Sequence, residues 1–271
     1  MLRDPRLNHI SECSVEGGFV YTDVEGAKTK FCGLLKILAE ICYPDYDYKD
    51  ALRHAPIEKR FRLKTGLRRP WQGQRRGKLV HDQVRAIVNG GVAARDAIFG
   101  RQRSENAEHI IASLKTKQLR PLVAEYIVYD ERIRLASPID IVCVTTKKSG
   151  SKLSLIEVKN WSNGFTHANG HLKNPPSLRH LNNCALHQAF LQLAFYRRLV
   201  EMQQPGLEIG PCYVVQETQS YTRYYRLPDE FVRASVELFD CVANHRSRQL
   251  FLNLFDKQAR PAGAAFQLAS L

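Results

Sequence analysis

Residues 137–161 read SPIDIVCVTTKKSGSKLSLIEVKNW, and this stretch decides the fold that we expect. Two apolar, β-branched runs flank a turn rich in Lys, Ser and Gly, which is the pattern of a β-hairpin. Asp140 lies at the start of the first strand, while Glu157 and Lys159 lie at the end of the second. Because side chains alternate across a strand, Glu157 and Lys159 share one face, and Asp140 can join them across the hairpin.

Three charges at one end of an apolar hairpin need compensation, because an unpaired buried ion costs several kcal/mol. A hard divalent cation such as Mg²⁺ or Mn²⁺ can supply it, with Asp140, Glu157 and the main-chain carbonyl of Val158 as oxygen ligands. Lys159 would then orient or help deprotonate a water molecule aimed at phosphorus, which indicates phosphodiester hydrolysis. The alternative is a surface ion pair that contributes at most about 1 kcal/mol and has no function.

Four short motifs resemble those of a known nuclease superfamily. PID at 138–140, followed by EVK at 157–159, is similar to the core of the PD-(D/E)XK nucleases. GKLVH at 77–81 resembles the Gly-x-x-x-His motif of the RecB-like exonuclease branch, and QLAFY at 192–196 resembles its Gln-x-x-x-Tyr motif. The resemblance spans about residues 75–217. It departs from the branch at Ala136-Ser137-Pro138, where a glycine often stands before the first acidic ligand.

The resemblance implies a fold and a set of site residues. The fold is α/β, with a restriction-endonuclease-like core in which a small mixed β-sheet is flanked by helices. Neutral imidazole is a competent metal donor, which suits a histidine ligand. An amide could hold Lys159 or a phosphate oxygen, and a phenol could contact a nucleic-acid backbone. The implied metal ligands are His81, Asp140, Glu157 and the carbonyl of Val158, and the implied catalytic residues are Asp140, Glu157, Lys159, Gln192 and Tyr196.

Glu125 is an additional candidate carboxylate. Leu122 to Tyr129 has the composition of a strand, in which Glu125 should share a face with Val123 and Ile127. An acid on an apolar strand face needs a partner. It is either an edge-strand charge that blocks aggregation or, as the resemblance implies, a further acid of the site.

The chain is strongly basic, with a net charge of +13 and a pI near 9.5. Between Arg53 and Lys78, ten Lys or Arg residues accompany a single acid, Glu58. Such a cluster favours contact with a polyanion, although a solvated basic loop would have the same composition. The residues expected to bind nucleic acid are Arg68, Arg69, Arg75, Arg76 and Lys78.

The spacing of the cysteines and the hydropathy of the chain predict which cofactors it lacks and in which compartment it occurs. The seven cysteines include no CxxC pair, which favours reduced thiols in an intracellular protein and predicts neither zinc nor an iron–sulfur cluster. No apolar run reaches the roughly 20 residues that span a bilayer, so we expect a soluble protein without a membrane partner. Asp4, Glu12 and Glu16 near the N-terminus favour nucleus or cytoplasm over the mitochondrion, because mitochondrial presequences avoid acidic residues.

Two regions are expected along the chain. Residues 1–74 should form a helical and basic N-terminal region packed on the core, with an amphipathic helix from Thr29 to Cys42. Residues 75–271 should form the nuclease core together with a C-terminal strand and helices. The core should include a helix from Arg75 that stops at Gly90-Gly91.

These features together predict a metal-dependent DNA nuclease. Members of the branch that it resembles act on DNA ends or single strands, so the resemblance implies an exonuclease, with a role in replication, repair or recombination inferred from this class. Two alternatives stay open, namely an RNA endonuclease of the same superfamily and a non-catalytic nucleic-acid-binding protein with this fold. The sequence predicts no specific protein partner.

Overall fold

The computed structural model describes most of the chain between residues 10 and 259. The described ranges are 10–13, 18–22, 28–43, 72–99, 105–147, 150–160, 165–166, 170–218 and 221–259. Side chains are not described for residues 10–30, 72–76, 91–99, 146–147 and 251–259. Within these ranges, no helix combines the length and the apolarity that a membrane span requires.

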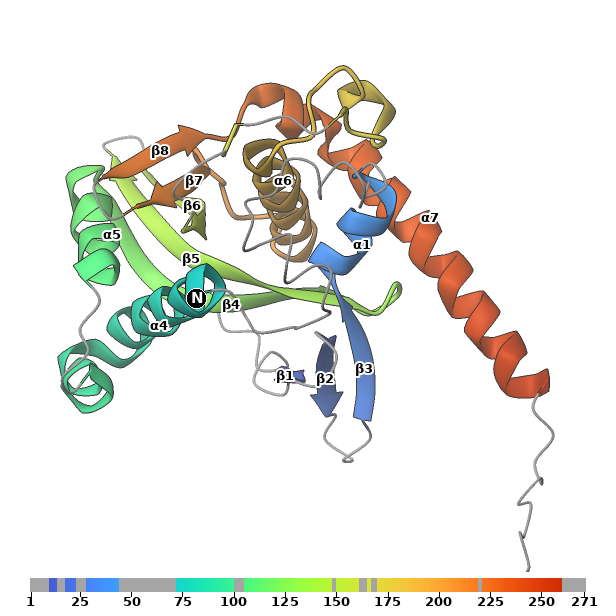
Figure 1. Cartoon of the computed structure of the whole chain (residues 1–271), viewed down its shortest axis with the longest axis horizontal. Helices are drawn as coiled ribbons and strands as arrows, with labels where there is room; N and C mark the ends of the chain where they lie inside the picture. The colour runs from blue at the N-terminus through green and yellow to red at the C-terminus, as the bar shows by residue number, and fades with distance from the viewer. Residues whose placement is uncertain are drawn as a thin grey trace, which may run out of the picture.

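In the described part of the chain, the expected hairpin forms the centre of an eight-stranded mixed sheet (Figure 1). Its strands are β5 (Leu135–Lys147) and β6 (Gly150–Lys159), which pair antiparallel from Ile141 opposite Ile156 onward. The other strands are β1 (Ile10–Cys13), β2 (Gly18–Thr22), β3 (Lys28–Gly33), β4 (Leu119–Asp130), β7 (Tyr213–Glu217) and β8 (Thr222–Arg226). β4 lies antiparallel on β5, β7 lies parallel to β6, and β8 lies antiparallel on β7 at the edge.

Helices cover both faces of this sheet. α6 (Ala185–Gln203) packs against β4 and β6, and α1 (Leu34–Ile41) and α7 (Asp229–Ala259) pack with it in one large apolar cluster. α4 (Gln72–Phe99) and α5 (Glu105–Thr116) share a second apolar cluster with the opposite side of β4, β5 and β6. A short 3-10 turn, η2 (Pro176–Leu178), precedes α6. We call these two sides of the sheet the α6 face and the α4 face.

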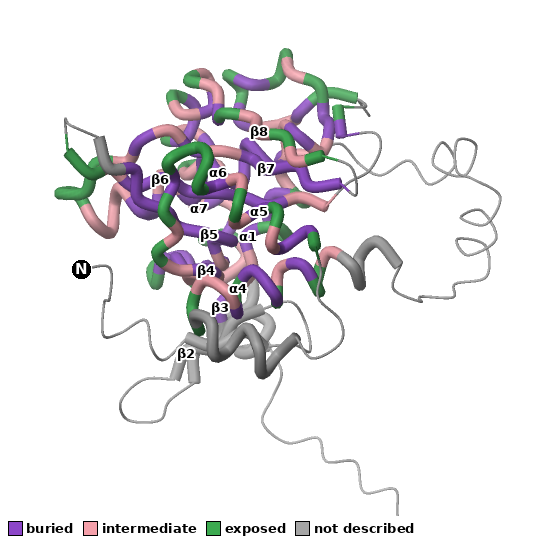
Figure 2. The backbone as a smooth tube through the Cα atoms, turned by 90° about the vertical axis from the view of Figure 1, so that its left-hand side faces the viewer, coloured by how far each residue is buried: buried purple, intermediate pink, exposed green. Residues whose placement is uncertain are grey.

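This architecture confirms the α/β class and the mixed sheet flanked by helices, and it is consistent with a restriction-endonuclease-like core. Buried residues concentrate in the central strands and α6, while exposed residues gather in the outer loops and turns (Figure 2). The sheet is larger than expected because β1, β2 and β3 extend it through a parallel pairing of β3 with β5. The proposed boundary between residues 74 and 75 stays a prediction.

Two expected helices have different boundaries in the structure. The helix expected from Thr29 to Cys42 begins only at Leu34, because residues 28–33 pair with β2 and β5 as a strand. Its apolar residues have helical spacing, but pairing with two neighbouring strands overrides that local pattern. The helix expected to stop at Gly90-Gly91 continues to Phe99. Glycine costs about 1 kcal/mol per residue in a helix but does not block it.

Strand β4 changes its face orientation at Glu125. Val123 and Tyr126 both pack against the cluster on the α6 face, whereas Ile127 packs in a separate cluster with Tyr129. Strict alternation would place Val123 and Tyr126 on opposite faces. Glu125, between them, has a φ of 54°, in the left-handed region. The expectation that Glu125 shares a face with both Val123 and Ile127 is therefore wrong, because its backbone conformation interrupts the alternation.

Strand β5 changes orientation at the matching position. Ile139 and Val142 both pack on the α6 face, so alternation is interrupted around Asp140. The register on either side places Asp140 opposite Glu125, and these two residues are omitted from the ladder. The two interruptions therefore bring two carboxylates together at one point of the sheet, where a helix of the α4 face can reach them.

Candidate metal centre

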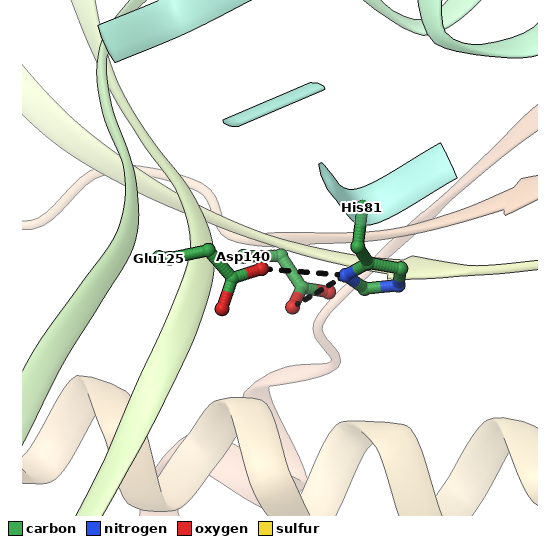
Figure 3. A group of neighbouring side chains, drawn as sticks. All are labelled: His81, Glu125 and Asp140. Atoms are coloured by element: carbon green, nitrogen blue, oxygen red, sulfur yellow. Dashed lines mark ion pairs between the residues drawn. The ribbon is translucent and has the colours of Figure 1, made fainter. Parts of the chain in front are cut away.

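Three potential ligand atoms gather where β4 and β5 change orientation. His81, Glu125 and Asp140 each offer one ligand atom, and these atoms all lie within 4.8 Å of one another. His81 Nδ1 is 3.5 Å from Glu125 Oε1 and 3.3 Å from Asp140 Oδ1. Both carboxylates point toward the imidazole, which comes from α4, while the acids come from the two strands (Figure 3). Carboxylate oxygens and an imidazole nitrogen form a donor set that suits a divalent cation.

Helix α4 is fixed to the sheet by apolar packing and by one side-chain amide. Val80 and Val84 are buried in the cluster of the α4 face, which places His81 beside the strands. Two turns further along, Asn89 Nδ2 donates to the Ala124 carbonyl at 2.9 Å, and Ala124 N–H donates to Asn89 Oδ1 at 2.8 Å. The amide thus acts as a strand partner for the residue directly before Glu125.

A polar network occupies the α6 face of the same region. Lys159 Nζ donates to Glu157 Oε1 at 2.6 Å and to Gln192 Oε1 at 3.2 Å. Gln192 Nε2 in turn donates to the Tyr196 hydroxyl at 2.7 Å, which lies 2.8 Å from Ser137 Oγ. The network connects β6, α6 and the start of β5, and it fixes the Lys159 ammonium beside the Glu157 carboxylate.

Asp140 joins the two groups. Its Oδ1 faces His81, while its Oδ2 accepts a 2.6 Å hydrogen bond from the Val158 N–H. Val158 lies between Glu157 and Lys159, so the carboxylate also fixes the end of β6. One buried side chain therefore sets the position of α4 relative to the EVK motif.

The charges of the centre shift one another's pKa values. The Asp140 carboxylate raises the pKa of His81 to about 11, in spite of burial. Burial raises the pKa of Asp140, but the charge and hydrogen bond of His81 outweigh it, and the pKa lies below its usual value. Burial and the nearby Asp140 raise the pKa of Glu157 to about 7. Two cations, His81 and Lys159, thus compensate the carboxylates when no metal is bound.

The residues present fit a divalent cation. Glu157 Oε2 is buried without a hydrogen-bond partner among the described residues, which is costly unless another group satisfies it. The metal-ligand group of the described residues comprises His81, Glu125 and Asp140, and Glu157 lies outside it. The predicted set overlaps with this group at His81 and Asp140. Ligation by Glu157 and by the Val158 carbonyl stays a prediction.

Tyr196 lies too deep for the role that the resemblance implies. It is fully buried, at 0% exposure, between Ser137 and Gln192. Its phenol therefore cannot reach a substrate backbone in this conformation. We expect it to orient the Gln192 amide, which holds Lys159.

The residues expected to bind nucleic acid are described only in part. Lys78 is exposed on α4, three residues before His81. Arg75 and Arg76 lie on the same helix, but their side chains are outside the description, and Arg68 and Arg69 lie outside the described residues.

Two residues of the centre have no sequence motif. Asn89 lies eight residues after His81, and helical periodicity alone could have suggested that both point toward the sheet. Ser137 lies directly before the PID motif, and its hydroxyl contacts Tyr196. Neither partner, Ala124 nor Tyr196, could be assigned without the fold.

The chain is similar in structure, at low sequence identity, to solved proteins. No family model matches it, and no curated protein matches it in sequence. Among solved structures, the crystal structure of a "putative exonuclease" from Eubacterium rectale is similar to it at 13% sequence identity. The alignment covers 70% of each chain with a TM-score of 0.40.

Proposed function

We propose that the protein is a metal-dependent nuclease that hydrolyses phosphodiester bonds in DNA, acting on ends or single strands. One observation carries the proposal. Asp140 lies 3.3 Å from His81 of the ligand group and accepts a 2.6 Å hydrogen bond from the Val158 N–H, which lies between Glu157 and Lys159 in the chain. Metal-binding and proton-handling groups thus meet at one buried carboxylate, which an accidental surface ion pair would not require.

Residues on the two faces of the sheet would have different roles, namely metal binding and orientation of the reacting water or phosphate. His81, Glu125 and Asp140 would hold Mg²⁺ or Mn²⁺, with Glu157 as the further carboxylate. When bound, such a cation supplies Lewis-acid stabilisation of charge and lowers the pKa of water. The Lys159 ammonium, fixed by Glu157 and Gln192, orients the attacking water or a phosphate oxygen. Tyr196 and Ser137 hold the Gln192 amide in the orientation that this requires.

The charge of the molecule supports a nucleic-acid substrate. The net charge of +13 and the exposed Lys78, close to His81, favour a polyanion near the centre. Because phosphate contacts displace counterions, affinity should fall steeply with salt. The preference for DNA and for ends rests on the resemblance described above.

The proposal is tested by cleavage of three labelled substrates. Linear single-stranded, linear double-stranded and covalently closed DNA are incubated with wild type and Lys159→Ala, in Mg²⁺, Mn²⁺ or EDTA. Lys152→Ala is the matched control, because Lys152 lies on the same strand but pairs with Glu208 at the surface. We expect metal-dependent loss of linear DNA by wild type and Lys152→Ala, and at least about 100-fold slower cleavage by Lys159→Ala.

Other outcomes would contradict single parts of the proposal. Cleavage of closed circles would support phosphodiester hydrolysis but contradict an activity directed at DNA ends. Labelled RNA of the same sequence is added as a fourth substrate, and cleavage of this RNA without cleavage of DNA would change the proposed substrate to RNA. Equal rates for Lys159→Ala and Lys152→Ala would remove Lys159 from the mechanism, and DNA binding without any cleavage would leave only a binding protein.

A further inference from the structure

A row of polar side chains crosses the α6 face from Lys159 to the edge of the sheet. Lys159 of β6 is the register partner of Gln216 in β7, and Gln216 is the register partner of Arg223 in β8. Register partners point to the same face, and neighbouring strands lie about 4.8 Å apart. Arg223 therefore lies two strand spacings, or about 10 Å, from the strand of Lys159.

The outer end of this row is ordered by contacts with two tyrosines. Arg223 Cζ lies 5.5 Å from the centroid of the Tyr221 ring, and Arg223 Nη1 donates a 3.4 Å hydrogen bond to the Tyr225 hydroxyl. The Tyr225 hydroxyl donates to Gln216 Oε1 at 3.0 Å, and its ring packs against Phe165. Tyr225 is thus held in the fold, whereas Arg223 and Tyr221 are exposed to solvent.

The chemistry of the exposed end suits a nucleic-acid strand. An exposed guanidinium binds phosphate oxygens, and a tyrosine ring stacks on unpaired bases of any sequence. The acid of β7, Glu217, alternates to the opposite face, where it accepts a hydrogen bond from Thr222. The row therefore presents the Arg223 guanidinium at its exposed end, while Lys159 at its inner end is paired with Glu157.

We propose that Arg223 and Tyr221, supported from within the fold by Gln216, form a track that holds one unpaired strand of nucleic acid and leads it toward Lys159. The proposal rests on the proposed function for the role of Lys159, and it adds the route by which the strand reaches the centre. Phosphates lie against Arg223 and a base stacks on Tyr221, while the buried Gln216 and Tyr225 support them. DNA and RNA share this chemistry, so both are included in the test.

The test measures binding in EDTA, where cleavage plays no part. Fluorescence anisotropy is recorded with labelled single-stranded DNA, RNA of the same sequence and duplex DNA, for wild type, Arg223→Glu and Tyr221→Ala. Arg226→Glu is the matched control, because Arg226 is exposed on the same strand and its register partner, Tyr213, packs on the α4 face. It introduces the same change in charge on the opposite side.

We expect single-strand affinity to fall roughly tenfold in Arg223→Glu and about fivefold in Tyr221→Ala. Loss of one phosphate contact should also reduce the salt dependence, by about 0.7 in the slope of log K against log salt. Arg226→Glu should stay within about twofold of wild type, and thermal melting should be equal for all four proteins. A larger effect on either DNA or RNA would identify the source of the strand.

Three results would overturn the track. Equal losses in Arg223→Glu and Arg226→Glu would show only a general effect of charge. Unchanged affinity in Tyr221→Ala would exclude stacking, and an equal loss for duplex DNA would exclude recognition of unpaired bases. This binding test is separate from the test of the nuclease proposal. Wild type can fail to cleave DNA and still show this pattern of binding, and it can cleave DNA without showing the pattern.

Discussion

At the scale of single residues, Asp140 is the side chain on which the others depend. It contacts His81 through one oxygen and the Val158 N–H through the other, so a change here disturbs both α4 and the end of β6. Glu125 and Glu157 lie on either side of it and differ in their partners. Glu125 faces His81, whereas Glu157 is paired with Lys159 and keeps one oxygen without a partner among the described residues.

In spite of this difference, we expect both carboxylates to contribute to Mn²⁺ binding. Glu125→Gln and Glu157→Gln should each weaken Mn²⁺ binding at least about tenfold in calorimetric titrations, because each removes a negatively charged oxygen donor. Glu131→Gln, an exposed residue in the turn after β4, should leave the affinity unchanged. If Glu125→Gln bound Mn²⁺ like wild type while Glu157→Gln did not, the metal would lie on the α6 face only.

The buried phenol of Tyr196 gives a stability prediction. Tyr196→Phe removes the acceptor of the Gln192 amide and the partner of Ser137, which leaves two buried polar groups unsatisfied. The free energy of unfolding should fall by about 1–3 kcal/mol in urea titrations. Tyr213→Phe, on β7, is the control and should change it by less than about 0.5 kcal/mol. A loss in Tyr196→Phe no larger than in the control would show that the phenol is not needed to satisfy this network.

At the scale of elements, the contact between α4 and β4 depends on Asn89. Asn89→Ala removes both hydrogen bonds to Ala124, next to the strained backbone of Glu125. We expect the free energy of unfolding to fall by about 1–3 kcal/mol, and Mn²⁺ affinity to fall with it because His81 and Glu125 lose their fixed separation. Asp82→Ala, exposed on the same helix, is the control in both measurements. Unchanged Mn²⁺ affinity in Asn89→Ala would show that packing of Val80 and Val84 alone positions His81.

The sequence pattern correctly predicted the secondary structure that depends on neighbouring residues in the chain. The hairpin of β5 and β6 follows from β-branched runs around a turn, and the face shared by Glu157 and Lys159 follows from alternation. The pattern failed at residues 28–33, where pairing with β2 and β5 overrides helical spacing. It also failed at Glu125, because a positive φ costs about 1–2 kcal/mol outside glycine and no propensity predicts it. The motifs of the candidate site were therefore recognisable in the sequence, whereas the arrangement of Glu125 against His81 required the fold.

At the scale of the whole molecule, the centre lies where the two apolar clusters meet. His81 extends from the helix layer of the α4 face, and Gln192 from the helix layer of the α6 face. A cation held by α4 and the central strands would therefore connect segments that are more than 40 residues apart in sequence. Because the unfolded chain lacks this arrangement, binding should stabilise the folded state selectively.

This coupling predicts a thermal shift with metal. At a free Mn²⁺ concentration of about 100 times Kd, one site adds about 2.7 kcal/mol, which corresponds to a rise in Tm of roughly 5–10 °C in a chain of this size. Asp140→Asn, which keeps the shape of the side chain but removes its charge, should abolish the shift. Glu131→Gln should retain it in full. A shift of equal size in Asp140→Asn would mean that Mn²⁺ binds elsewhere on the molecule, and the centre at the meeting point of the two clusters would then have to be abandoned.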